Sequence, residues 1–117
     1  MMPAETIDYH IRSKLWIEDA EGKVVFGLGR YRILEAIDRL GSLQAAAKDL
    51  RMSYRAVWCR IKASEERLGK SLVARKGRGS CLTPLAQKLM KQYRRIQAVV
   101  ENESDDIYDD LMSHHLS

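Results

Sequence analysis

The side chains best suited to chemistry lie between residues 53 and 62 and again between residues 75 and 78. Arginine, serine and tyrosine side chains can hydrogen-bond phosphate oxygens, and an arginine can also donate two hydrogen bonds to one guanine. Arg55 is the first candidate for such a base contact, whereas Arg60 and Lys62 are better placed for phosphates. The full candidate set for binding a nucleic acid is Ser53, Tyr54, Arg55, Trp58, Arg60, Lys62, Arg75, Lys76 and Arg78.

Two of these residues have an equally simple structural interpretation. A tryptophan on a helix is more often partly buried packing than a ligand contact, so Trp58 is open to both interpretations. Tyr54 could likewise fold back over the hydrophobic core.

The distribution of charge supports a polyanionic partner. Residues 28–100 hold 17 of the 20 Lys and Arg residues but only five of the 16 Asp and Glu residues. Residues 101–117 instead carry six acidic residues and no Lys or Arg. Such a basic block is typical of a protein that binds nucleic acid, and a merely solvated basic face is the alternative.

The sequence offers little for catalysis or metal binding. Its three histidines, His10, His114 and His115, lie at the two ends, and Cys59 and Cys81 match no metal-binding or redox spacing. No nucleophile has a base at a plausible spacing, and there is no glycine-rich phosphate loop. We therefore expect no enzyme, no catalytic residue, no metal site and no cofactor.

No apolar run reaches the length of a membrane span, and the N-terminus lacks the pattern of a signal peptide. The expectation is a cytoplasmic protein without a membrane partner.

The elements that must position the candidate residues form a helix-turn-helix over residues 41–68. Gly41 is placed to end one helix, and Ser42 can cap a second helix over 43–50, whose alanines allow close packing. Ser53 can cap a third helix reaching Leu68. Its inward stripe is Val57, Ile61 and Leu68, with Ser64 as a weak polar member. Only the first turns of such a helix approach the base edges in a major groove.

Further elements flank this motif on both sides. The alternation of apolar and polar residues predicts a β-hairpin over 9–27, and the glycines and cations of 71–83 predict a second hairpin, or wing. Thr83-Pro84 opens a helix predicted over 84–103, followed by an acidic tail or short helix over 104–117. The spacing of Leu89, Tyr93, Ile96 and Val100 predicts either a dimerisation seam or packing on the domain's own core.

The stretch from Gly41 to about Leu89 resembles the winged helix-turn-helix of LysR-type regulators. Matching features include the paired alanines, the Ser53 cap, Glu65, Leu68-Gly69, Arg75, Gly79 and Leu82-Thr83. Met52-Ser53-Tyr54-Arg55 followed by Trp58 resembles still more the DNA-binding domain of ModE-type, molybdate-responsive regulators. That resemblance extends over nearly all of residues 9–100. Ser64 departs from the LysR pattern, which has an apolar residue there, and the wing has fewer glycines than is typical of ModE-type proteins.

Residues and resemblance together predict a mainly α-helical winged helix-turn-helix domain over 1–103, with small β-hairpins and a long C-terminal helix. The resemblance implies a dimeric, sequence-specific transcription regulator that binds double-stranded DNA. Because the chain stops at Ser117, we expect no effector domain and no molybdate sensing, and a separate effector protein becomes a further expected partner. The alternative is a protein-interaction module built on the same scaffold.

Overall fold

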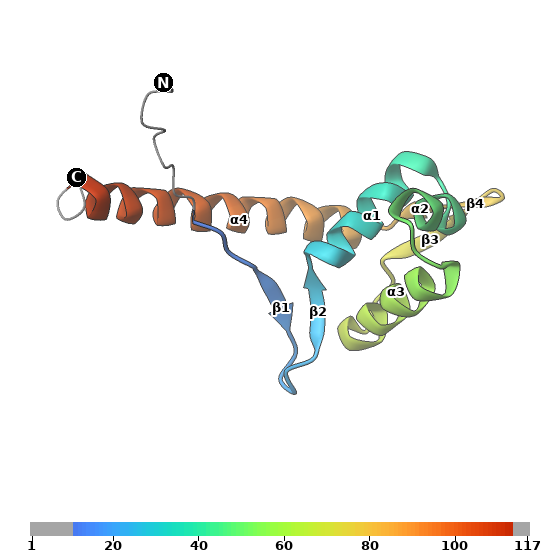
Figure 1. The fold of residues 1–117 in the computed structure, drawn as a ribbon. Helices are drawn as coiled ribbons and strands as arrows, with labels where there is room; N and C mark the ends of the chain where they lie inside the picture. Colours follow the sequence, from blue (N-terminus) through green and yellow to red (C-terminus); the bar gives the residue numbers. More distant parts are fainter. Residues whose placement is uncertain (1–10, 114–117) are drawn as a thin grey trace, which may run out of the picture.

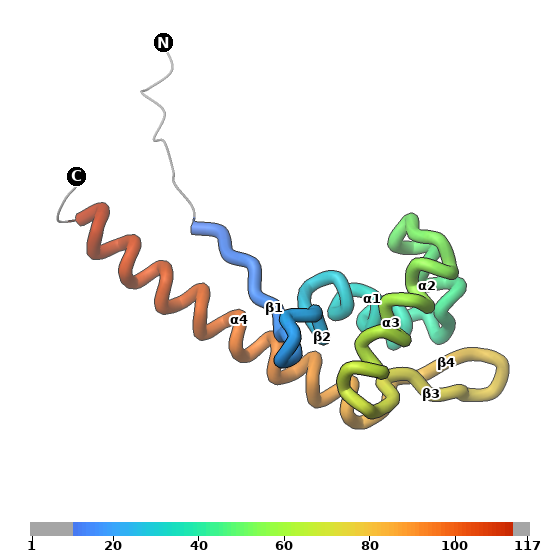
Figure 2. Tube along the Cα trace, turned by 90° about the horizontal axis from the view of Figure 1, so that it is seen from below, coloured from blue at the N-terminus to red at the C-terminus, as the bar shows by residue number. Residues whose placement is uncertain are grey.

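The computed structural model describes residues 11–113 as one mainly helical domain with two small antiparallel hairpins. This architecture confirms the predicted fold class. Its elements in chain order are β1 (Trp16–Glu18), β2 (Val24–Gly27), α1 (Leu28–Leu40), α2 (Leu43–Leu50), α3 (Tyr54–Leu68), β3 (Val73–Lys76), β4 (Gly79–Leu82) and α4 (Pro84–Leu111). Helices α1 to α3 and the β3–β4 hairpin gather at one end of the molecule, and α4 extends away from them (Figures 1 and 2).

The first hairpin is shorter than the sequence predicts. Strand β1 pairs with β2 only over residues 16–18, with an irregular register between Ile17 and Glu18. The residue before β1 has a partner outside the hairpin, since the Leu15 carbonyl accepts a hydrogen bond from the Tyr93 hydroxyl of α4 at 2.8 Å. Residues 11–15 therefore do not continue the strand, and the predicted start at Tyr9 lies outside the described residues.

The predicted end of α1 and the predicted starts of α2 and α3 are confirmed. Gly41, at φ 82°, ends α1 in the left-handed conformation that glycine adopts without strain. The Ser42 hydroxyl accepts from the Ala45 N–H at 3.0 Å, and the Ser53 hydroxyl accepts from the Ala56 N–H at the same distance. Because each serine satisfies one of the free N–H groups of its helix, both helices begin where the sequence predicts.

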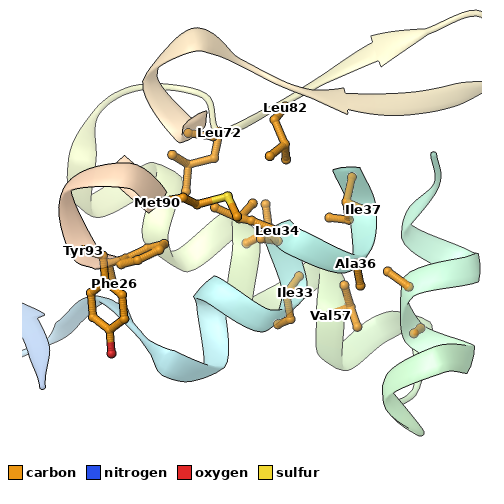
Figure 3. Close-up of a cluster of buried hydrophobic side chains, with 14 of the residues drawn as sticks. Phe26, Ile33, Leu34, Ala36, Ile37, Val57, Leu72, Leu82, Met90 and Tyr93 are labelled. Carbon is orange, nitrogen blue, oxygen red and sulfur yellow. The ribbon is translucent and has the colours of Figure 1, made fainter. Parts of the chain in front are cut away.

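The hydrophobic core lies where α1 meets the other elements (Figure 3). Phe26 of β2 meets the Tyr93 ring edge to face, with the ring centroids 5.2 Å apart. Tyr93 is only 2% exposed, and this corrects its predicted place in a dimer seam. A side chain enclosed by its own fold is not available to a second subunit. The buried apolar residues are Val25, Phe26, Ile33, Leu34, Ala36, Ile37, Ala46, Ala47, Val57, Ile61, Leu72, Leu82, Ala86, Met90 and Tyr93.

Helix α4 runs without a break from Pro84 to Leu111, so the predicted end at residue 103 is wrong. The acidic stretch after Val100 contains neither proline nor glycine, and the helix passes through Ser104. What looked like a separate tail is the distal end of α4 (Figure 2). Despite its length, α4 is too polar to span a bilayer, and none of the helices within residues 11–113 could do so.

Candidate nucleic-acid interface

The break between α2 and α3 is a short turn held by backbone hydrogen bonds to the end of α2. Arg51 follows α2 with φ 57°, a left-handed conformation, and its N–H still bonds back to the last turn of α2. A side-chain link joins α1 to α2, since the Arg39 guanidinium of α1 contacts Glu35 of the same helix at 3.0 Å and Asp49 of α2 at 2.9 Å. These two carboxylates raise the pKa of Arg39, so it remains charged.

The exposed surface of α3 carries the predicted binding residues, with Arg60 on the edge opposite Tyr54 and Trp58, and the remaining face enters the core. Val57, Ile61 and Ser64 are buried. Tyr54 and Trp58 are 53% and 44% exposed. Trp58 is therefore on the surface and not in the core. The structure brings Ser53, Tyr54, Arg55, Trp58, Arg60 and Lys62 together as exposed side chains of this one helix and its cap.

Lys62 already has partners within the chain. Its ammonium lies 3.2 Å from Glu65 and 5.8 Å from the centre of the Trp58 ring. Both contacts hold the lysine along the helix surface, with its charge partly balanced by Glu65. Of the predicted phosphate contacts, Lys62 is thus the one that has a competing carboxylate within residues 11–113.

Glu65 is a functional residue whose role sequence reasoning missed. Its Oε2 accepts from the backbone N–H groups of Leu72 at 2.7 Å and Val73 at 3.2 Å. One mostly buried carboxylate therefore ties α3 to the first strand of the wing. The signal available in the sequence was the match of Glu65 to the LysR pattern, which does not reveal these bonds.

The wing is the β3–β4 hairpin, paired in register from Val73 opposite Leu82 to Lys76 opposite Gly79. Arg75 and Lys76 are consecutive on β3, so they point to opposite faces. Arg75 lines a groove between α3 and the wing, together with Tyr54 and Trp58. Arg78 lies in the turn. The wing thus offers cations on both faces and at its tip.

The wing is fixed to the helix-turn-helix by a close backbone contact. The Ser80 N–H donates to the Gly41 carbonyl at 2.8 Å. A Cβ added at Gly79 would lie 2.2 Å from that same carbonyl oxygen. Glycine is required at residue 79 by this approach of β4 to the turn between α1 and α2, and not by its backbone angles.

The departure at Ser64 has a partner in α1. The buried Ser64 hydroxyl accepts from the Nε–H of Arg30 at 3.2 Å. Desolvation of Arg30 lowers its pKa, and repulsion from Arg60 and Arg67 lowers it further. A polar contact thus replaces the apolar packing expected between α1 and α3, and it draws three arginines together. Sequence reasoning included Arg60 but missed Arg30 and Arg67.

The predicted dimerisation residues do not form one seam. Tyr93 belongs to the core and Leu89 is half-buried against it. Ile96 is 47% exposed, and Val100 lies beside it. Together with Val99, which is 67% exposed, these residues line a shallow apolar patch on α4.

Within residues 11–113, no three His, Cys, Asp or Glu side chains are grouped so that they could hold a metal ion. Cys59 and Cys81 are free thiols.

The exposed basic face of α3, its serine cap and the docked wing define a winged helix-turn-helix domain of the kind that transcription regulators use to bind DNA. The sequence pattern of the bacterial regulatory helix-turn-helix protein, lysR family, matches residues 28–87. Because this match covers more than half of the chain, the protein belongs to that family.

Individual relatives agree with this assignment. The molybdenum-pterin-binding protein MopB of Rhodobacter capsulatus is 37% identical over 79 residues, covering 63% of this chain and 29% of MopB. The molybdenum transport protein ModE of Azotobacter vinelandii is 32% identical over 87 residues, covering 70% of this chain and 32% of ModE. The chain thus spans about a third of the length of these relatives.

Among solved structures, the DNA-binding domain of CbnR in complex with DNA has the same fold. The TM-score is 0.56 at 27% identity, and the alignment covers 70% of this chain and 94% of that domain.

Proposed function

We propose that the protein is a sequence-specific regulator of transcription that binds double-stranded DNA with α3 in the major groove. The observation that carries this proposal is the exposed N-terminal part of α3, which lies beside a cationic wing with a groove between them. A major groove admits one helix, and cations on an adjacent hairpin can then follow the backbone or enter the minor groove.

Arg55 is the residue proposed to read a base. It lies in the first turn of α3, on the exposed face, and none of the ion pairs among residues 11–113 includes it. A free guanidinium can bond the O6 and N7 atoms of guanine together. Arg75, Lys76 and Arg78 of the wing are proposed to contact phosphates, as is Arg60.

The proposed assembly is a homodimer. Its seam is the apolar patch of α4 formed by Ile96, Val99 and Val100. Two-fold symmetry would present two copies of α3 to half-sites about one helical turn of DNA, or a multiple of it, apart.

Binding to DNA would place the protein in the cytoplasm. A separate effector protein stays a prediction, with the acidic distal end of α4 as its candidate surface.

The test is selection of bound duplexes from a random pool, performed with the wild-type chain and with Arg55→Ala and Arg75→Ala. We expect Arg55→Ala to lose preference at one position in each half-site, at a cost of about 1–3 kcal/mol for the preferred base. Arg75→Ala should weaken binding to all sequences alike. Uniform weakening by Arg55→Ala would contradict its role in base reading.

A second measurement tests the DNA-binding role itself. If roughly six phosphates are contacted, the logarithm of affinity should fall against the logarithm of salt concentration with a slope of about −5. Absence of duplex binding, or an affinity indifferent to salt, would contradict the proposal and favour a protein-interaction module.

A further inference from the structure

Three arginines meet at the edge of α3 that faces the β1–β2 hairpin. Arg30 of α1 bonds Ser64, and this places its side chain against α3. Arg60 and Arg67 are four residues before and three after Ser64, so each is one helical turn away on the same side. The Nη1 of Arg67 donates to the Val24 carbonyl of β2, which fixes this edge against the hairpin.

The positive charge of this cluster is left largely uncompensated. None of the ion pairs found between residues 11 and 113 includes Arg30, Arg60 or Arg67. The serine hydroxyl and the Val24 carbonyl accept hydrogen bonds but carry no formal charge. Asp19 of the hairpin turn has its pKa lowered first by the backbone N–H groups of Lys23 and Glu21, which its Oδ1 already accepts, and only then by the charge of Arg67. Like charges held together in this way favour an anionic ligand.

The position of the cluster indicates which anion it would hold. Helix α3 lies between the β1–β2 hairpin and the wing (Figure 2). A helix inserted in a major groove has a phosphate backbone along each of its two edges. Tyr54 and Trp58 line the edge toward the wing, whose cations serve that side. The opposite edge has no second wing, and Arg30, Arg60 and Arg67 occupy it.

We infer that Arg30, Arg60 and Arg67 form a phosphate-binding site at the hairpin edge of α3, filled by the DNA backbone opposite the strand contacted by the wing. This inference rests on the proposed DNA-binding function and adds a third contact region to α3 and the wing. Ser64 positions Arg30 in the site. The acidic turn of the hairpin limits the site beyond Arg67, because phosphate and carboxylates repel each other.

The test compares Arg60→Gln and Arg30→Gln with Arg12→Gln by titrating a duplex at several salt concentrations. Arg12 is a matched control, since it lies against the distal part of α4 beside Glu101 and Asp105. We expect each site variant to weaken binding about three- to tenfold at physiological salt and to reduce the salt slope by about one. Base preference should not change. Arg12→Gln should behave as wild type.

The outcomes separate the site from the function. If the wild-type chain binds DNA and Arg60→Gln matches Arg12→Gln in affinity and slope, the site is overturned together with the phosphate contact proposed for Arg60, and the DNA-binding function itself stands. If the wild type binds no duplex, the proposed function fails first. Arg60 is exposed, so Arg60→Gln should fold and keeps the test decisive even if Arg30→Gln does not.

A titration of the DNA-free chain with inorganic phosphate distinguishes the source of the anion. The Nε–H resonances of the arginines report occupancy by nuclear magnetic resonance. We expect weak, unsaturated shifts at millimolar phosphate, because a single free phosphate lacks the neighbouring contacts of a duplex. Saturation at submillimolar phosphate, lost in Arg60→Gln, would assign the site to a free oxyanion and overturn the backbone assignment.

Discussion

At the scale of single residues, the sharpest test concerns Glu65 and its exposed neighbour Glu66. Glu65→Ala would leave the N–H groups of Leu72 and Val73 without their acceptor. An unsatisfied, partly buried donor costs about 1–3 kcal/mol, so we expect the free energy of unfolding to fall by about that amount in urea titrations. Glu66→Ala removes the same charge from the solvent side of α3 and should change stability by less than about 0.5 kcal/mol.

The same variant separates stability from binding. Glu65→Ala also frees Lys62 from its ion pair, but it loosens the first strand of the wing. We expect the loss of wing position to dominate, so that affinity for DNA falls although the charge of the protein has become more positive. A higher affinity in Glu65→Ala than in Glu66→Ala would show that Glu65 acts mainly by competing for Lys62.

At the scale of elements, Gly79 and Gly29 form a contrasting pair. Gly79→Ala places a Cβ against the Gly41 carbonyl, so β4 must move and the Ser80 bond to Gly41 weakens. We expect a loss of about 1–3 kcal/mol in stability and weaker DNA binding through a displaced wing. Gly29→Ala meets open space within α1 and should stabilise the protein by about 0.5–1 kcal/mol. Thermal unfolding of both variants measures these opposite signs, and equal effects would contradict the role of the close contact.

The elements that sequence reasoning located best are those fixed by local chemistry. Ser42, Ser53, Thr83 and Gly41 act within a few residues of where they stand, so caps and helix ends could be predicted from them. The exposed face of α3 could also be predicted, because the helical period places Val57, Ile61 and Ser64 on the opposite, buried face. Contacts between distant segments could not be predicted in this way. Tyr93 has the right spacing for a dimer seam, but its ring packs against Phe26 and its hydroxyl donates a hydrogen bond to the Leu15 carbonyl.

The candidate site was predictable in part for the same reason. The cations of α3 and the wing are close together in the sequence. Arg30 and Arg67, in contrast, are positioned by hydrogen bonds to residues far away in the sequence, the Ser64 hydroxyl and the Val24 carbonyl. The shortening of β1 results from a tertiary contact, the bond of Tyr93 to Leu15. The continuation of α4 results from the absence of a helix breaker in the acidic stretch. Spacing alone did not distinguish a polar tail from a polar helix.

At the scale of the whole molecule, the long α4 places its apolar patch outside the domain's own core. Val99 is 67% exposed, and with Ile96 and Val100 it would be covered in the proposed dimer. We expect Val99→Asp to shift the protein from dimer to monomer in sedimentation measurements, because burying a carboxylate among Ile96 and Val100 at a subunit interface costs its hydration, even with Arg95 at the rim of the patch. Its melting temperature at concentrations where the wild type is monomeric should be unchanged, since Val99 takes no part in the core.

Ala98→Asp provides the control, because it adds the same charge to the neighbouring exposed position of α4, about 100° around the helix and away from the patch. It should leave the dimer intact. On a two-half-site duplex, Val99→Asp should bind more weakly than Ala98→Asp, whereas the two should bind a single half-site alike. The gain on the longer duplex comes from linking two reading helices in one assembly, so it disappears with the dimer. If Val99→Asp remains dimeric, the two-fold axis lies elsewhere and the patch of Ile96, Val99 and Val100 is not the seam.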